Sequence, residues 1–213
     1  MNRGGKKRLC LLLILDVLMI MMEIYALNIS RMESGWKLFR YYTQNSNILA
    51  LLACLLCAAK EIACLFKDAK LPRWTRKLRY YAACCLALTL VIAGFFLAPI
   101  NPDLGFAGFM LEGKYLYLHT ICPIVGVALF FLHPGMGFRE KHAIKALLPT
   151  IVYGAISLCL NAAGTYSGPY PFLRVREQAG YVTAVGCIAV LGVNYALSRS
   201  LAALGTPRRR PAK

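Results

Sequence analysis

A cluster of hydroxyl and amide side chains opens one apolar stretch of the sequence and contains a residue suited to covalent chemistry. Thr43 is followed by Gln44, Asn45, Ser46 and Asn47, and then directly by an apolar run. A threonine hydroxyl becomes a nucleophile when a base removes its proton. The amides of Gln44, Asn45 and Asn47 can then donate hydrogen bonds to an oxyanion or bind the substrate. The same cluster also suits a helix start at the membrane interface, with Thr43, Asn45 or Ser46 as N-cap.

His119 is the candidate base. It lies in another apolar stretch, four residues after Tyr115. Histidine exchanges protons near neutral pH, and four helical residues place it about 6 Å deeper than Tyr115. Tyr115 suits the aromatic belt of a membrane protein, and we also predict that it contacts substrate. A hydrogen bond between two membrane helices is the alternative role of His119.

Two acidic residues lie inside the first apolar stretch. Asp16 and Glu23 are seven residues apart, so two helical turns place both carboxyl groups on one face. Ionisable groups in hydrocarbon are costly and often functional. We interpret Glu23 as a group that orients His119 or accepts a proton, with Asp16 as the second candidate. Neutral, hydrogen-bonded carboxyl groups are the alternative.

A segment rich in glycine, proline and aromatic residues precedes the last apolar stretch. Tyr170, Pro171 and Phe172 form its centre. Its two prolines favour a stiff turn, and its aromatic side chains predict that it folds back over the helices. It would serve as a simple cap or as a lid over a site, and as a lid it would contact substrate through these three residues.

Six apolar runs must position these residues. They cover about residues 9–29, 43–66, 80–100, 115–132, 146–163 and 180–198, and a spanning helix needs about 20 mostly apolar residues. The chain of 213 residues is 59% apolar and 16% charged, with a mean hydropathy of +0.56, which excludes an ordinary soluble domain. We predict an all-α polytopic membrane protein, with residues 1–213 forming one domain of six transmembrane helices. Lys60 and Glu61 should lie at the interface.

The basic residues predict the orientation. If both termini are cytoplasmic, that side holds 19 of the 25 Lys and Arg residues, in agreement with the positive-inside rule. The largest basic cluster consists of Lys67, Lys70, Arg73, Arg76, Lys77 and Arg79. Together with the basic tail at 208–210, this cluster should contact anionic lipid headgroups. The net charge of +16 therefore indicates a multi-pass protein of the cell membrane rather than a nucleic-acid-binding protein, and we expect that membrane to be a bacterial plasma membrane.

This orientation places Thr43, His119 and the Tyr170 segment on the outer side of the membrane. A Thr–His pair there would meet the ester bonds of membrane lipids. The chain has no Gly-x-Ser-x-Gly elbow, no HExxH helix, no P-loop and no GxGxxG fingerprint. No Cys/His spacing matches a zinc site, so we predict neither a metal nor an organic cofactor. The nine cysteines should serve as small apolar residues.

Three motifs resemble those of a known family and occur in the same order. They are YTQNSN at 42–47, LHTICP at 118–123 and GPYPFL at 168–173. They are similar to segments of the androgen-induced-gene family of transmembrane threonine hydrolases and its bacterial six-span relatives. The resemblance implies a multi-pass enzyme that hydrolyses fatty acid esters of hydroxy fatty acids, with Thr43 as nucleophile and His119 as base. The polar residues after Thr43 differ from the more apolar segment of the animal members.

Two other functions stay open at this point. The first is a non-enzymatic carrier or lipid-binding protein, in which Asp16, Glu23 and His119 line a pathway or a pocket. The second is an acyltransferase that uses the Thr43–His119 pair and passes the acyl group to a second lipid instead of water.

Overall fold

The protein is a bundle of apolar helices in the computed structural model, which describes residues 3–133 and 137–206. Those two ranges contain helical segments and no strand. Six segments are long and apolar enough to cross a membrane, namely Arg3–Arg40, Tyr42–Phe66, Arg73–Ile100, Gly113–Leu132, Glu140–Ala162 and Gly180–Leu204. The predictions of an all-α protein and of six membrane helices are confirmed.

The long helices are joined by short helical turns. In chain order the elements are α1 (Arg3–Ser34), η1 (Gly35–Arg40), α2 (Tyr42–Phe66), α3 (Arg73–Ile92), η2 (Ala93–Leu97), η3 (Ala98–Ile100), α4 (Gly105–Leu111), α5 (Gly113–Tyr115), η4 (Leu116–Ile121), α6 (Cys122–Leu132), α7 (Glu140–Ala146), α8 (Leu148–Ala162), η5 (Pro171–Leu173) and α9 (Gly180–Leu204).

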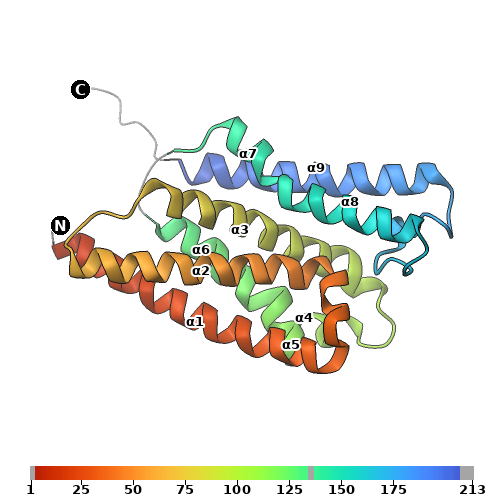
Figure 1. The fold of residues 1–213 in the computed structure, drawn as a ribbon, viewed down its shortest axis with the longest axis horizontal. Helices are drawn as coiled ribbons and strands as arrows, with labels where there is room; N and C mark the ends of the chain where they lie inside the picture. The colour runs from red at the N-terminus through yellow and green to blue at the C-terminus, as the bar shows by residue number, and fades with distance from the viewer. Residues whose placement is uncertain (1–2, 134–136, 207–213) are drawn as a thin grey trace.

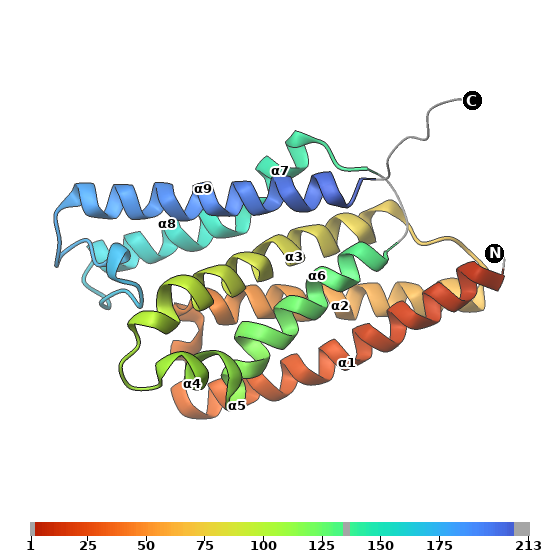
Figure 2. The same cartoon turned by 180° about the vertical axis from the view of Figure 1, so that it is seen from behind.

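Helix α3 lies at the centre of the bundle, with α1 and α2 on one side and α8 and α9 on the other (Figures 1 and 2). The buried residues of α1 are spaced alternately by three and four, as in a coiled-coil seam. They are Leu9, Leu12, Asp16, Met19, Glu23, Ala26 and Ser30. Gly126 lets α6 approach α3 closely, because a Cβ atom there would lie 2.4 Å from Cδ1 of Leu86.

Two prolines interrupt the regular helical hydrogen bonding. Pro99 follows the π-helical turn η2, and Pro123 follows the π-helical turn η4. A proline has no N–H, so the carbonyl four residues earlier loses its usual donor and the turn can widen. For Pro123 that carbonyl belongs to His119, and His119 therefore lies on a π-helical turn.

Helices α8 and α9 form a layer of their own beside α3 (Figure 1). The buried residues of α8 are all polar, Thr150, Ser157 and Asn161, whereas many of its apolar side chains are exposed. This pattern suits a helix that faces lipid with its outer surface and places hydroxyl and amide groups against the rest of the bundle.

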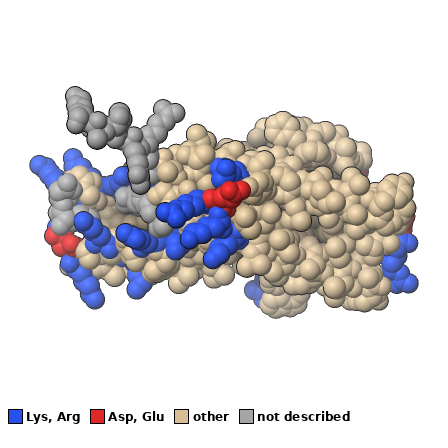
Figure 3. Space-filling view, turned by 90° about the horizontal axis from the view of Figure 1, so that it is seen from above, with Lys and Arg blue, Asp and Glu red and all other residues tan. Residues whose placement is uncertain are grey.

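The two ends of the bundle differ in charge. We define the basic end as the end that holds the start of α1, the segment 67–72 and the end of α9, and the loop end as the end that holds η1, α4 and the segment 163–179. Most Lys and Arg residues visible in Figure 3 lie toward the basic end. The basic residues at 208–210 lie outside the described residues.

The prediction that the whole basic cluster contacts headgroups is wrong for two of its members. Arg76 and Arg79 are buried, whereas Lys67, Lys70 and Arg73 are exposed. Arg76 donates to the backbone carbonyl of His133 and, at 2.6 Å, to that of Gly205. These bonds tie α3 to the ends of α6 and α9, so this arginine has a structural role.

Candidate functional site

Thr43 lies on the wall of a cavity of about 260 Å³ near the loop end. Helices α2, α3, α8 and α9, the turn η2 and the segment around η5 line this cavity, which we name the Thr43 cavity. Most of the lining residues are aliphatic. Thr43, Thr89, Thr150 and Tyr170 are lining residues that carry a hydroxyl group. The cavity therefore offers an apolar environment with a few hydroxyl groups, as small-molecule sites commonly do.

The first turn of α2 positions Thr43. Tyr41 is the N-cap residue and makes no side-chain capping bond, so the prediction of Thr43, Asn45 or Ser46 as N-cap is wrong. Asn45 instead donates its amide to the carbonyls of Phe39 and Tyr41, at 2.7 Å in each case. Its side chain thereby bonds to carbonyl groups before α2 and does not accept a hydrogen bond from an N–H group in the first turn of α2. Those N–H groups need another acceptor.

Tyr170 supplies that acceptor from a distant segment. Its phenol oxygen accepts the N–H of Tyr42 at 3.1 Å and lies close to the hydroxyl and the backbone of Thr43. Burial raises the pKa of Tyr170 to about 12, although the neighbouring polar groups of Thr43 and Tyr42 act to lower it. The phenol is therefore neutral at physiological pH and can donate a hydrogen bond as well as accept them.

The segment that carries Tyr170 folds back over the helices, as predicted. Tyr170 and Phe172 stack with ring centroids 5.9 Å apart, and Phe172 lines the Thr43 cavity, whereas Pro171 is exposed. Asn161 accepts the backbone N–H of Gly168 at 2.7 Å. A Cβ atom at position 168 would lie 2.9 Å from Nδ2 of Asn161, so glycine is needed for this close approach.

His119 is buried, with 3% of its surface exposed. Its Nδ1 atom lies 2.7 Å from the carbonyl oxygen of Phe109, and its ring stacks on Phe109 and Tyr115 at centroid distances of 4.6 Å and 5.3 Å. A carbonyl oxygen only accepts hydrogen bonds, so Nδ1 carries the proton. In the neutral ring, Nε2 is then left with the lone pair that a base requires.

Asn47 connects the segments that carry Thr43 and His119. Its Nδ2 atom donates to the carbonyl of Thr43 at 2.7 Å and to the carbonyl of Leu118 at 3.1 Å. Among the described residues no hydrogen bond joins the side chains of Thr43 and His119, and Gln44 is buried with its Oε1 atom unbonded. The structure thus brings the two backbones together through Asn47 and gives the Thr43 hydroxyl Tyr170 as its neighbour.

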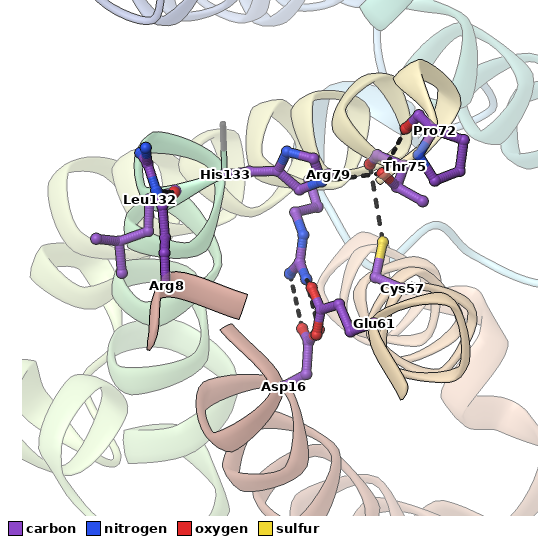
Figure 4. Close-up of polar contacts among 9 residues, drawn as sticks. All are labelled: Arg8, Asp16, Cys57, Glu61, Pro72, Thr75, Arg79, Leu132 and His133. Carbon is purple, nitrogen blue, oxygen red and sulfur yellow. Dashed lines mark hydrogen bonds and ion pairs between the residues drawn. The ribbon is translucent and has the colours of Figure 1, made fainter. Parts of the chain in front are cut away.

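Asp16 and Glu23 have different surroundings. Asp16 forms a bidentate ion pair with Arg79, at 2.7 Å and 2.5 Å (Figure 4). Glu23 is fully buried, and its carboxyl group faces the thiol of Cys122, one helical turn beyond His119. Of the two acidic candidates, Glu23 is therefore the one placed close to the His119 helix.

Glu61 joins the same buried cluster. Its Oε1 atom lies 2.5 Å from Nη2 of Arg79 (Figure 4), and its side chain is fully buried. The prediction that Glu61 lies at the interface is wrong, because Arg79 attracts it into the bundle. We name Asp16, Glu61 and Arg79 the charge cluster.

Sequence analysis missed Thr89 and Thr150, two hydroxyl residues that line the Thr43 cavity. Tyr42 and Thr150 share a hydrogen bond of 2.8 Å, Asn194 donates to Thr150 at 2.7 Å, and Ser46 and Thr89 lie 2.7 Å apart. The two missed residues, Thr89 and Thr150, are polar residues within predicted apolar runs. A search for hydroxyl and amide groups in every predicted span would have found them, although not which of them meet.

No protein-family model, no curated protein and no solved structure matches this chain.

Proposed function

We propose that the protein is an integral membrane hydrolase of lipid esters, with Thr43 as nucleophile and His119 as base. The observation that carries the proposal is the position of Thr43, on the wall of an apolar cavity at the first turn of α2. A helix N-terminus stabilises negative charge, and an apolar cavity accepts an acyl chain. The resemblance of the three motifs to those of the transmembrane threonine hydrolases supports the same chemistry.

The first step would form an acyl-threonine. Oγ1 of Thr43 attacks the ester carbonyl carbon while Nε2 of His119 takes the hydroxyl proton. The hydrogen bond from Nδ1 to the carbonyl of Phe109 holds the ring in the tautomer that this requires. The oxyanion needs donors, and the phenol of Tyr170 is a neutral donor beside Thr43. The tetrahedral intermediate then breaks its bond to the substrate alkoxide, which leaves with the proton held by His119.

The second step would release the acid. His119 takes a proton from a water molecule that attacks the carbonyl carbon of the acyl-threonine. Collapse of this second tetrahedral intermediate returns the proton to Thr43 and frees the carboxylic acid. His119 is not among the described residues that line the Thr43 cavity, so this sequence requires Nε2 of His119 to come within hydrogen-bond reach of Oγ1 of Thr43 when substrate binds.

The difference in charge between the two ends of the bundle supports a location for this chemistry in the outer half of the membrane. The positive-inside rule assigns the basic end to the cytoplasm, which puts the Thr43 cavity in the outer half of a plasma membrane. The substrates would be amphiphilic lipids whose chains stay in the hydrocarbon while the ester reaches Thr43. Fatty acid esters of hydroxy fatty acids are the first substrates to test.

Purified wild-type protein and Thr43→Ala are compared for release of fatty acid from such esters. We expect Thr43→Ala to lose hydrolysis, Thr43→Ser to keep part of it, and Thr183→Ala, a buried threonine of α9 outside the cavity lining, to match the wild type. Hydrolysis by Thr43→Ala at the wild-type rate would overturn the proposal.

Lipid binding without catalysis is the second candidate function. It is favoured by the apolar cavity together with the lack of a Thr43–His119 hydrogen bond among the described residues. Lipid binding that survives in Thr43→Ala, with no turnover in the wild type, would support it. Transfer of the acyl group to an added lipid alcohol instead of water would indicate an acyltransferase.

A further inference from the structure

A second cavity lies between α2 and α8, on the other side of two tyrosines. It has a volume of about 580 Å³, within the range of roughly 300–1,000 Å³ that ligand pockets span. Tyr42 and Tyr153 line both cavities and pack edge to face, with centroids 5.3 Å apart. Thr43 does not line the second cavity, which we name the α2–α8 groove.

The groove is polar at one end and apolar along its length. Arg40, Thr165 and Tyr166 line it at the loop end, and Leu49, Val152 and Ile156 line it farther along. Its lining on α8 extends from Pro149 to Leu160, which corresponds to about 16 Å of helix. A polar end and an apolar length suit the binding of an amphiphile whose headgroup lies at the membrane surface and whose chain lies in the hydrocarbon.

Arg40 gives the polar end a positive charge. Its guanidinium lies over the ring of Tyr166, 4.7 Å from the centroid, and none of the described carboxylates pairs with it. Its backbone carbonyl accepts the hydroxyl of Tyr153 at 2.6 Å, which fixes the residue at the mouth of the groove. An arginine held in this way can bind a phosphate through two parallel N–H donors.

We propose that the α2–α8 groove binds an anionic phospholipid, with the phosphate on Arg40 and an acyl chain along α8. The hydroxyl groups of Thr165 and Tyr166 at the same end are further donors to the headgroup. The site is separate from the Thr43 cavity and does not depend on catalysis. Its occupant would fill the space between α2 and α8 and support the Tyr42–Tyr153 wall of the Thr43 cavity.

The test measures which lipid stays bound. The full-length protein is reconstituted in vesicles of equal amounts of phosphatidylglycerol and phosphatidylcholine, extracted in mild detergent, and analysed for retained lipid by native mass spectrometry. We expect the wild type to retain phosphatidylglycerol in preference to phosphatidylcholine. Arg40→Gln should lower this retention about five-fold, as expected for one basic residue at the membrane surface.

Matched variants distinguish lipid binding in the α2–α8 groove from a general attraction of anionic lipid to basic residues. Lys37→Gln removes an exposed charge of η1 outside the groove and should leave retention unchanged. Ile156→Trp should fill the groove and lower retention, whereas Ile188→Trp on the exposed face of α9 should not. Equal retention by Arg40→Gln and the wild type, an equal loss in Lys37→Gln, or no effect of Ile156→Trp would each overturn the proposal.

Discussion

The charge cluster and the Thr43 cavity are both buried polar regions, but they are built in opposite ways. In the charge cluster, one arginine binds two carboxylates at distances of 2.5–2.7 Å, and helices α1, α2 and α3 are joined. Around the Thr43 cavity the polar groups are neutral hydroxyl and amide groups beside open space. Charged side chains within a membrane protein require partners, and here the pairing ties three helices together, whereas neutral donors beside a cavity leave room for a ligand.

The largest expected effect is a loss of catalytic rate, and it follows substitution of His119, the proposed base for Thr43. His119→Gln removes the base but can keep a hydrogen bond to the carbonyl of Phe109, so the fold should be retained. General base catalysis contributes about 10²- to 10⁴-fold, and we expect a loss of kcat in that range in a lipid ester assay. A His119→Gln protein with wild-type kcat would show that His119 is a helix-packing residue.

The second prediction concerns stability, at the charge cluster. Arg79→Met leaves Asp16 and Glu61 buried without a counter-charge, and breaking a buried pair in this way costs about 3–5 kcal/mol. Thermal unfolding in detergent should shift to a much lower temperature. Arg73→Met, an exposed arginine on the same helix, is the control and should unfold like the wild type.

A triple variant sharpens that result. Asp16→Asn, Glu61→Gln and Arg79→Met together remove all three charges, so most of the stability lost in Arg79→Met should return. A triple variant as unstable as Arg79→Met would mean that the arginine acts through packing rather than through its charge.

The third prediction tests the link between the segments that carry Thr43 and His119. Asn47→Leu removes the amide that bonds the carbonyls of Thr43 and Leu118, and a buried acceptor left unsatisfied costs about 1–3 kcal/mol. We expect lower thermal stability together with slower hydrolysis, because α2 and η4 lose their connection. Asn28→Leu, an exposed position on α1, should change neither, and an unchanged rate in Asn47→Leu would argue against the link.

The smallest effect on stability is expected at Tyr170. Tyr170→Phe keeps the stacked ring but removes the oxygen that accepts the N–H of Tyr42, which should cost about 1 kcal/mol of stability. Tyr181→Phe, at an exposed position of α9, serves as the control in the same unfolding measurement. Equal stability of Tyr170→Phe and wild type would show that water replaces the phenol at the start of α2.

The helices were predictable from the sequence because hydrophobic length alone identifies a membrane span. The partners of polar residues were not, since they depend on how distant helices pack. Glu61 and Arg79 both lie near predicted helix ends and were assigned to the surface, yet they bond to each other inside the bundle. Similarly, Asn45 was a candidate cap, but the acceptor for the α2 amide comes from Tyr170, 128 residues from Tyr42.

Direct identification of the nucleophile tests the central claim most closely. The purified protein is treated with a fluorophosphonate, digested, and analysed by mass spectrometry for the modified residue. The proposed function predicts that phosphonylation occurs on Oγ1 of Thr43 and disappears in Thr43→Ala. Modification of another residue, or equal labelling of Thr43→Ala and the wild type, would contradict it.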